Sequence, residues 1–141
     1  MGNAVTVTND DRVEIRDLIS RYNKAIDTGD ADGYANTFTA DGQFIGIVGT
    51  FNGRDELRAF AAAYATEEQY ADFASAQHWV TNVVVDAVEG DDERATVFSH
   101  LQMVKPLADG GRILLVGHYD DIVRRADGGW LFEQRIVVSD A

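Results

Sequence analysis

The spacing of hydrophobic residues changes once along the chain, from a helical period to a period of two. In residues 9–28 apolar positions recur every three to four residues, which predicts an amphipathic helix of about five turns, capped by Asn9 or Asp10. A shorter helix is expected from residue 31 to about residue 38, and a third begins near residues 52–55. Residues 43–48 are typical of a short strand. The polar segment 66–72 is expected to be a loop over the mouth of a pocket.

From residue 74 onward, apolar and polar residues alternate, as they do in β-strands. Turns rich in Asp and Gly at residues 89–92, 108–111 and 126–129 separate four strands of about ten residues. Strands joined by such short turns pair as antiparallel neighbours. Helices followed by a strand meander predict an α+β fold, in which a curved, twisted sheet of four to six strands wraps around the long N-terminal helix. A cone-shaped cavity would lie between helix and sheet.

Length and composition predict a single domain over residues 1–141, with residues 1–8 as a loose lead-in. The formal net charge of −12 disfavours nucleic acid or an anionic membrane as a partner. The chain has no cysteine, so disulfide and thiolate chemistry are excluded. No run approaches the ~18 apolar residues that span a bilayer. No signal-peptide pattern opens the chain either, so we expect a cytoplasmic protein.

His78 lies in a predicted strand whose two faces are both largely apolar, so the strand is expected to be covered on both sides. The face of His78 carries Val80, Asn82 and Val84, and the other face carries Trp79, Thr81, Val83 and Val85. A histidine in such a place needs a partner, and we predict that Asp27, in the last turn of the first helix, is that partner. Two simpler interpretations stay open. In the first, Asp27 is an exposed residue at a helix end. In the second, His78 is a half-buried histidine that is hydrogen-bonded to a backbone carbonyl.

Other polar side chains on the predicted strands have either a structural or a cavity-lining interpretation. His118 shares a face with Leu114, Val116, Asp120 and Ile122, and both His100 and His118 are either surface residues or cavity residues. Arg135 either pairs with Glu133 at the surface or faces inward as an anion-binding group.

Several motifs of other chemistries are absent from the sequence. The three histidines and the carboxylates show no metal-ligand spacing such as His-x-x-x-His, so no metal is expected. No Gly-rich phosphate loop and no Gly-x-Ser-x-Gly turn is found, so nucleotide binding and serine nucleophile chemistry have no support.

Taken together, several segments resemble the SnoaL-like branch of the nuclear transport factor 2-like superfamily, which includes scytalone dehydratase, ketosteroid isomerase and lindane dehydrochlorinase. The segments are residues 15–22, Ala25-Ile26-Asp27 with Asp30, residues 38–42 and 49–53, His78-Trp79-Val80-Thr81-Asn82, and residues 124–132. The resemblance implies a cystatin-like α+β barrel, in which a cone-shaped, mixed, mostly antiparallel sheet surrounds the first helix.

The resemblance also implies roles for particular residues. Asp27 matches the aspartate that ends the first helix in the dehydratase and the dehydrochlorinase, and His78 matches the histidine that both use as base. Arg135 matches an arginine of the dehydrochlorinase pocket. Tyr22 stands where that enzyme has a catalytic lysine, a departure that argues against dehydrochlorination.

We therefore expect a lyase or isomerase that needs no cofactor, in which His78 abstracts a carbon-bound proton and Asp27 orients the imidazole. The expected substrate is a small apolar or aromatic molecule. The residues expected to bind it are Tyr22, Phe44, Trp79, Arg135 and His118. The pattern leaves open which substrate is used, and whether it undergoes elimination, isomerisation or cyclisation.

Two other functions are compatible with the same residues. One is a non-catalytic carrier of a small ligand, or a structural subunit of a larger oxygenase. The other is a polyketide-type cyclase in which Asp120 or Asp121 is the base. Because Trp79, Val83 and Val85 have no obvious second layer within one chain, we expect a homo-oligomer, with dimer and trimer both open.

Overall fold

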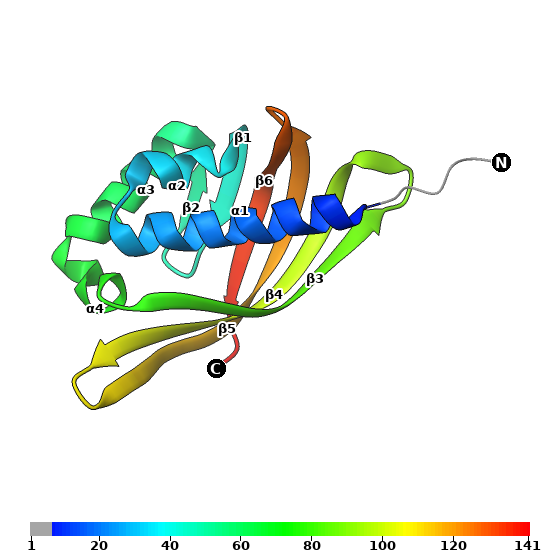
Figure 1. Cartoon of the computed structure of the whole chain (residues 1–141). Coiled ribbons are helices and arrows are strands. Elements are labelled where there is room, and N and C mark those ends of the chain that lie inside the picture. Colours follow the sequence, from blue (N-terminus) through cyan, green and yellow to red (C-terminus); the bar gives the residue numbers. More distant parts are fainter. Residues whose placement is uncertain (1–6) are drawn as a thin grey trace.

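A computed structural model describes residues 7–141 and places four α-helices, one short 3-10 helix and six strands in that range (Figure 1). Of the predicted lead-in, residues 1–6 lie outside the described residues. The elements in chain order are α1 (Asn9–Thr28), α2 (Ala31–Asn36), β1 (Phe38–Ile45), β2 (Thr50–Asn52), α3 (Gly53–Thr66), η1 (Glu68–Tyr70), α4 (Ala71–Ala74), β3 (Gln77–Val88), β4 (Asp91–Leu107), β5 (Gly110–Ala126) and β6 (Gly129–Ser139).

All six strands form one sheet, in the order β2-β1-β6-β5-β4-β3. The β1–β6 pair is parallel and every other neighbouring pair is antiparallel. Figure 1 shows α1 lying along one face of the curved sheet, with α2, α3 and α4 near its C-terminal end. The predicted α+β fold, a mostly antiparallel sheet around a long N-terminal helix, is confirmed.

The predicted five-turn helix exists, and its cap lies one residue before the predicted position. Thr8 is the N-cap: its hydroxyl accepts a hydrogen bond from the Asp11 backbone N–H, and Asp11 accepts one from the Thr8 backbone N–H. This reciprocal capping box satisfies two backbone donors at the start of the helix. At the other end, Gly29 adopts a left-handed conformation (φ 75°) and closes α1 beside Asp27.

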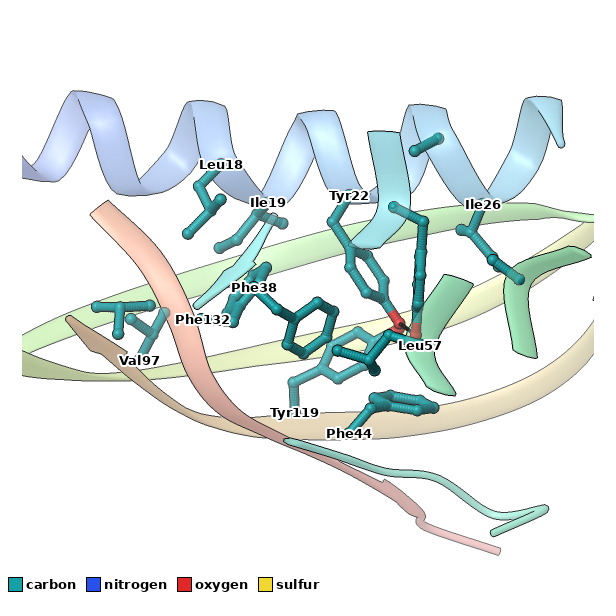
Figure 2. Close-up of a cluster of buried hydrophobic side chains, with 14 of the residues drawn as sticks. Leu18, Ile19, Tyr22, Ile26, Phe38, Phe44, Leu57, Val97, Tyr119 and Phe132 are labelled. Carbon is teal, nitrogen blue, oxygen red and sulfur yellow. Dashed lines mark hydrogen bonds between the residues drawn. The ribbon is translucent and has the colours of Figure 1, made fainter. Parts of the chain in front are cut away.

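The core between α1 and the sheet is mainly aromatic. Leu18, Ile19, Tyr22 and Ile26 point from α1 toward the strands, as Figure 2 shows. They meet rings from β1, β5 and β6, which include Phe38, Phe44, Tyr119 and Phe132. Burial of such large side chains stabilises the fold by roughly 1.5–3 kcal/mol each.

A β-bulge in β3 changes which side chains face α1. The register of β3 against β4 shifts between Thr81 and Val84, and Asn82 has a positive φ of 56°. Val85 is therefore buried, while Val84 and Trp79 are about half exposed. The prediction that both faces of this strand are covered is wrong, because an extra residue reverses the alternation and the outward face has no second layer in the chain.

A second bulge, in β6, also changes which side chains face the core. Val123 pairs with Phe132 and Ile122 pairs with Gln134, so Glu133 is the additional residue. Trp130 and Phe132 face the core before the bulge, and Arg135 faces it afterwards. The prediction that Gln134 and Ile136 share the face of Phe132 is wrong for the same reason.

Other boundaries also differ from the prediction. The first strand begins at residue 38 rather than 43, and α2 ends before it at Asn36. Residues 66–72 contain the 3-10 helix η1 and the start of α4 rather than an open loop. The strands β4 and β5 each have 17 residues, and the turn between them projects away from the helices (Figure 1). Within residues 7–141 no helix combines the length and apolar content needed to cross a membrane.

Candidate active site

Asp27 and His78 are in direct contact. The Asp27 Oδ1 atom lies 2.6 Å from His78 Nδ1, and Asp27 Oδ2 accepts a hydrogen bond of 3.0 Å from the His78 backbone N–H. One carboxylate therefore holds both the ring and the backbone of the same residue. Because an ionised carboxylate can only accept, it places the imidazole proton on Nδ1 and leaves the lone pair on Nε2.

Two elements far apart in sequence bring this pair together. Asp27 comes from the last turn of α1, and His78 comes from the second residue of β3. The His78 side chain is 7% exposed and the Asp27 side chain 18%, so the pair lies at the edge of the core rather than in bulk solvent. Neither of the simpler interpretations, an exposed aspartate or a histidine bonded to a carbonyl, describes the observed geometry.

His78 lines an apolar cavity of about 120 Å³ between α1, α3 and the sheet. The wall is mostly aromatic and aliphatic, with Ile47 and Val48 of the β1–β2 connection and Tyr70 and Phe73 of η1 and α4 contributing to it. The remaining lining residues are Tyr22, Ile26, Phe44, Phe60, Tyr64, Leu101, Met103, Leu115, Tyr119 and Val137. A concave, partly open site with few polar groups is typical of a pocket for a small organic molecule.

Of the residues predicted to bind substrate, Tyr22 and Phe44 line this cavity. Trp79 does not: it lies on the outward face of β3, and its indole N–H donates to the Gln77 side chain. His118 is also outside the cavity, because Tyr119 rather than His118 faces inward from β5. The His118 Nδ1 atom lies 2.7 Å from Asp140 Oδ1, and the His118 ring stacks on Phe98.

Arg135 faces inward, as one of the two predicted alternatives has it, but it does not line the cavity. It is fully buried behind the cavity wall, and its Nε lies 3.2 Å from Oδ1 of the equally buried Asp121. Glu133, its predicted surface partner, instead binds Arg94 and Arg124. Asp120 points outward, and neither it nor Asp121 lines the cavity, which argues against an aspartate base at these positions.

The buried ionisable groups around the cavity have shifted pKa values. Burial raises the pKa of Asp121 to about 7, although the Arg135 charge opposes that rise. Burial also raises the pKa of Tyr64, and the nearby Asp27 carboxylate raises it further. For Tyr22, burial raises the phenol pKa well above its ordinary value, and Arg135 offsets part of the rise. The tyrosines are therefore neutral hydrogen-bond donors at neutral pH.

Sequence reasoning missed several lining residues, above all Tyr119 and Tyr64. Tyr119 could have been found from the alternation of β5, which places Tyr119, Asp121 and Val123 on the face opposite to His118. Tyr64 lies at helical spacing with Leu57 and Phe60 of α3, and nothing in that spacing tells a core residue from a cavity residue. In the described part of the chain, no three His, Asp or Glu side chains gather in a way that could hold a metal ion.

A family model described as a SnoaL-like domain matches residues 8–136. The chain belongs to this SnoaL-like family. The resemblance found in the sequence is thus confirmed over most of the chain. Among curated proteins, none is similar enough to match.

Solved structures share the fold of this SnoaL-like chain. A protein of unknown function with a cystatin-like fold from Nostoc punctiforme is 28% identical, with a TM-score of 0.79, and the match covers 94% of this chain and 93% of that one. A nuclear transport factor 2-like protein from Novosphingobium aromaticivorans is 25% identical, with a TM-score of 0.78 and coverage of 93% and 82%. A candidate scytalone dehydratase from the same organism is 21% identical, with a TM-score of 0.74 and coverage of 95% and 89%. At that identity the last match speaks for the fold alone.

Proposed function

We propose that this SnoaL-like protein is a cofactor-independent lyase or isomerase in which His78 is the general base. The observation that carries the proposal is the 2.6 Å contact between Asp27 Oδ1 and His78 Nδ1 at the wall of an apolar cavity. The carboxylate fixes the tautomer whose Nε2 is free to accept a proton, and it stabilises the imidazolium that results.

In the proposed reaction, His78 Nε2 takes a proton from a carbon next to a carbonyl group. The electron pair of the broken C–H bond moves into the new C–C double bond, and the carbonyl π electrons move to oxygen, which forms an enolate. Where the substrate holds a neighbouring C–C double bond, the enolate is a dienolate, and the imidazolium can return its proton at the far carbon while the double bonds shift, which is an isomerisation. Alternatively it protonates a hydroxyl on the β carbon, which leaves as water while the enolate electrons form the new double bond. A positioned base of this kind contributes roughly 10²–10⁴-fold to a rate.

The test is exchange of carbon-bound hydrogen with deuterated water, followed by ¹H NMR for a panel of small cyclic ketones and hydroxylated aromatic compounds. We expect the wild-type protein to exchange at least one member of the panel, and His78→Ala and Asp27→Asn to lose about 100-fold or more of that rate. His118→Gln is a matched control, because His118 is also held by a carboxylate but lies outside the cavity. Equal loss in the control, or exchange that survives in His78→Ala, would contradict the proposal.

A non-catalytic carrier of a small apolar ligand is the second candidate, and the mostly apolar wall of the cavity favours it. The same NMR panel separates the two. A carrier would show ligand shifts in the cavity without any exchange, and the Asp27→Asn variant would bind as well as the wild type.

We also propose that a second copy of the chain covers the outward face of the sheet. Trp79, Val84, Val116 and Val138 lie about half exposed on that face, on β3, β5 and β6. Large apolar side chains exposed together on one face of a sheet are typical of a surface that another chain covers. Light scattering after size exclusion should give more than the monomer mass, and Val116→Asp should lower it. A monomeric wild-type protein would refute this proposal.

A further inference from the structure

The two halves of β3 present their side chains to the core in opposite alternation. Before the bulge, His78 lines the cavity and Val80 packs against the core. After the bulge, Val85 is buried and Val83 packs against the core. Inward positions are therefore three residues apart across the bulge, between Val80 and Val83, although they are two apart within each half. The bulge thus decides which residues of the first half face the cavity.

Asn82 has the backbone conformation that this bulge requires. The register shift leaves Asn82 and Val83 opposite a single residue of β4, Ser99. With a φ of 56°, Asn82 lies in the left-handed region, which a glycine occupies at the first position of many bulges. Asparagine enters this region more readily than most residues that carry a side chain. Its amide nitrogen lies 3.0 Å from Nδ1 of His100 on β4, which gives the side chain a partner in this conformation.

The second half of β3 is held in place by α1. Because β3 is the last strand of the sheet, its outer edge has no strand partner in the described part of the chain. Arg12 Nη1 instead donates a hydrogen bond of 2.7 Å to the Val85 carbonyl. Arg16 Nη2 donates one of 3.1 Å to the Val83 carbonyl. Together with the burial of Val85, these hydrogen bonds fix which residues of this half face the core.

A strand without the additional residue would bring a different side chain to the cavity. If Val85 stays inward, regular alternation continues the inward face through Thr81 and Trp79. His78 then lies on the outward face, away from Asp27. Trp79 is 48% exposed in the structure, and its indole is a large apolar group whose burial is favourable. Burial of this ring would therefore favour the arrangement in which the imidazole leaves the cavity, and the bulge opposes it.

We propose that Asn82 is a positioning residue, which keeps the bulge at this place in β3 and so sets His78 instead of Trp79 at the cavity wall. Asn82 acts chiefly by adopting the left-handed conformation, and its contact with His100 supports that conformation. The hydrogen bonds of Asp27 to the His78 ring and backbone then complete the arrangement. The importance of this arrangement for a reaction rests on the proposed function, but the faces of His78 and Trp79 are measurable without a substrate.

The direct test is a variant that lacks Asn82, compared with Asn82→Gly. Two NMR signals report the faces of β3. The first is ¹⁵N NMR of the His78 ring, whose proton should reside on Nδ1 in the wild type because that atom faces Asp27. The second is the NOE between the ε-methyl group of Met103, which lines the cavity, and the Trp79 indole. This NOE should be absent in the wild type, because Trp79 lies on the outward face.

We expect Asn82→Gly to keep both wild-type signals, because glycine adopts a positive φ without steric cost. Removal of Asn82 restores regular alternation. That variant should mix the tautomers of His78, show the NOE from Met103 to Trp79, and lose about 100-fold or more of the rate of proton exchange.

Asn82→Val tests the same point without shortening the chain, and it decides the question where the deletion fails to fold, as judged by its thermal melt. The left-handed conformation is unfavourable for valine and should shift the equilibrium between the two arrangements roughly tenfold or more toward regular alternation. Asp127→Val is the matched control. In the described part of the chain, Asp127 is the other non-glycine residue with a positive φ, of 53°, and it lies in the turn between β5 and β6. This control should lose stability and keep the wild-type His78 signal.

Wild-type His78 and Met103 signals in a folded deletion variant, or in Asn82→Val where the deletion does not fold, would overturn the inference. Loss of the signals in Asn82→Gly, or an equal change in Asp127→Val, would overturn it too. The proposed function fails separately. A wild-type protein that exchanges no proton overturns the proposed function alone, because the two NMR signals still report the faces of β3. Intact exchange in the wild type and in the folded deletion variant, with unchanged signals, overturns this inference alone.

Discussion

Two carboxylates near the cavity, Asp27 and Asp121, each pair with a nitrogen-containing side chain, but the two pairs differ in hydrogen bonding and in burial. Asp27 uses both oxygens in hydrogen bonds to His78, at 2.6 Å and 3.0 Å, and its side chain retains some exposure. Asp121 is completely buried, lies 3.2 Å from Arg135 at its nearest oxygen, and makes no well-aligned hydrogen bond within residues 7–141. The first pair lies at the cavity wall, where the proposed function needs a base, whereas the second is an ion pair buried behind that wall.

This difference follows from the chemistry of the two bases. Histidine gains and loses a proton near neutral pH, so a carboxylate that fixes its tautomer controls which nitrogen can react. Arginine keeps its charge at any ordinary pH, so burial turns it into a permanent field source that its aromatic neighbours partly compensate. Single substitutions should therefore affect stability far more at Arg135 than at Asp27.

The largest expected effect is that of Arg135→Met. It leaves the Asp121 carboxylate buried without a counter-charge, and such losses lower the free energy of unfolding by roughly 3–5 kcal/mol. The double variant with Asp121→Leu should regain most of this loss, because no charge is left in the core. Urea denaturation of both proteins measures the difference. A single variant as stable as the double variant would mean that the ion pair is not a strongly coupled unit.

A smaller effect is expected for Asp11→Asn, at a third carboxylate that is well supplied with donors. Asp11 accepts hydrogen bonds from the Thr8 backbone, Arg125 and the Trp130 indole, and so joins the start of α1 to the β5–β6 hairpin. We expect a loss of about 2–3 kcal/mol at pH 7, because several partners are left with a neutral amide.

Asp11 should also make the stability of the fold depend on pH in the acid range. Burial raises the pKa of Asp11, but its hydrogen bonds from Arg125, Thr8 and Trp130 outweigh that rise and hold the pKa well below its ordinary value. The contribution of Asp11 is therefore present above about pH 4 and is lost as the pH falls below it. Thermal melts from pH 7 to pH 2 should show that Asp11→Asn differs less and less from the wild type. A constant difference would refute this linkage.

For Asp27→Asn we expect a folded protein that has lost about 1–2 kcal/mol, since the amide oxygen can still accept one of the two hydrogen bonds. The informative measurement is ¹⁵N NMR of the His78 ring. In the wild type the proton should reside on Nδ1, and in the variant the tautomers should mix. An unchanged tautomer would show that Asp27 does not control the imidazole.

A last prediction concerns the pH dependence that Asp121 gives to the stability of the fold. Because burial raises the pKa of Asp121 to about 7, the folded state holds this proton to higher pH than the unfolded state does. The contribution of this group to the free energy of unfolding is therefore full below about pH 4 and declines as the pH rises toward 7. The Arg135→Met/Asp121→Leu double variant should lack this decline in a denaturation series over that range. Parallel curves for the two proteins would show that Asp121 is ionised throughout.

The elements were predictable where a local pattern decides them. The helical spacing of Leu18, Ile19, Tyr22 and Ile26 indicates α1, and the Asp- and Gly-rich turns indicate the meander of β3 to β6. Alternation failed after the bulges at Thr81–Val84 and at Glu133, because one extra residue reverses the inward face and nothing in the pattern locates it. The bulge in β6 is the reason that Arg135 was not placed on the face of Phe132. Trp79 was expected to bind substrate because nothing in the sequence shows what covers each face of β3.

The candidate site was predictable only in part. Pattern and family resemblance together pointed to Asp27 and His78, and Tyr22 and Phe44 do line the cavity. The alternation of β5 gives Tyr119 its inward face, but Tyr64 and the Asp121–Arg135 pair required the tertiary structure, because their spacing is equally compatible with an ordinary core.

By itself, the sequence determined the order of helices and strands, the antiparallel meander and the family, since each depends on local periodicity, turn chemistry or recognisable motifs. Only the tertiary structure decided that Asp27 meets His78, 51 positions further along the chain, and that Arg135 lies behind Tyr22 and Tyr119 instead of at the surface. The physical reason is that contacts between distant residues depend on strand register and sheet curvature. Bulges such as those in β3 and β6 shift that register here, and no local pattern records them.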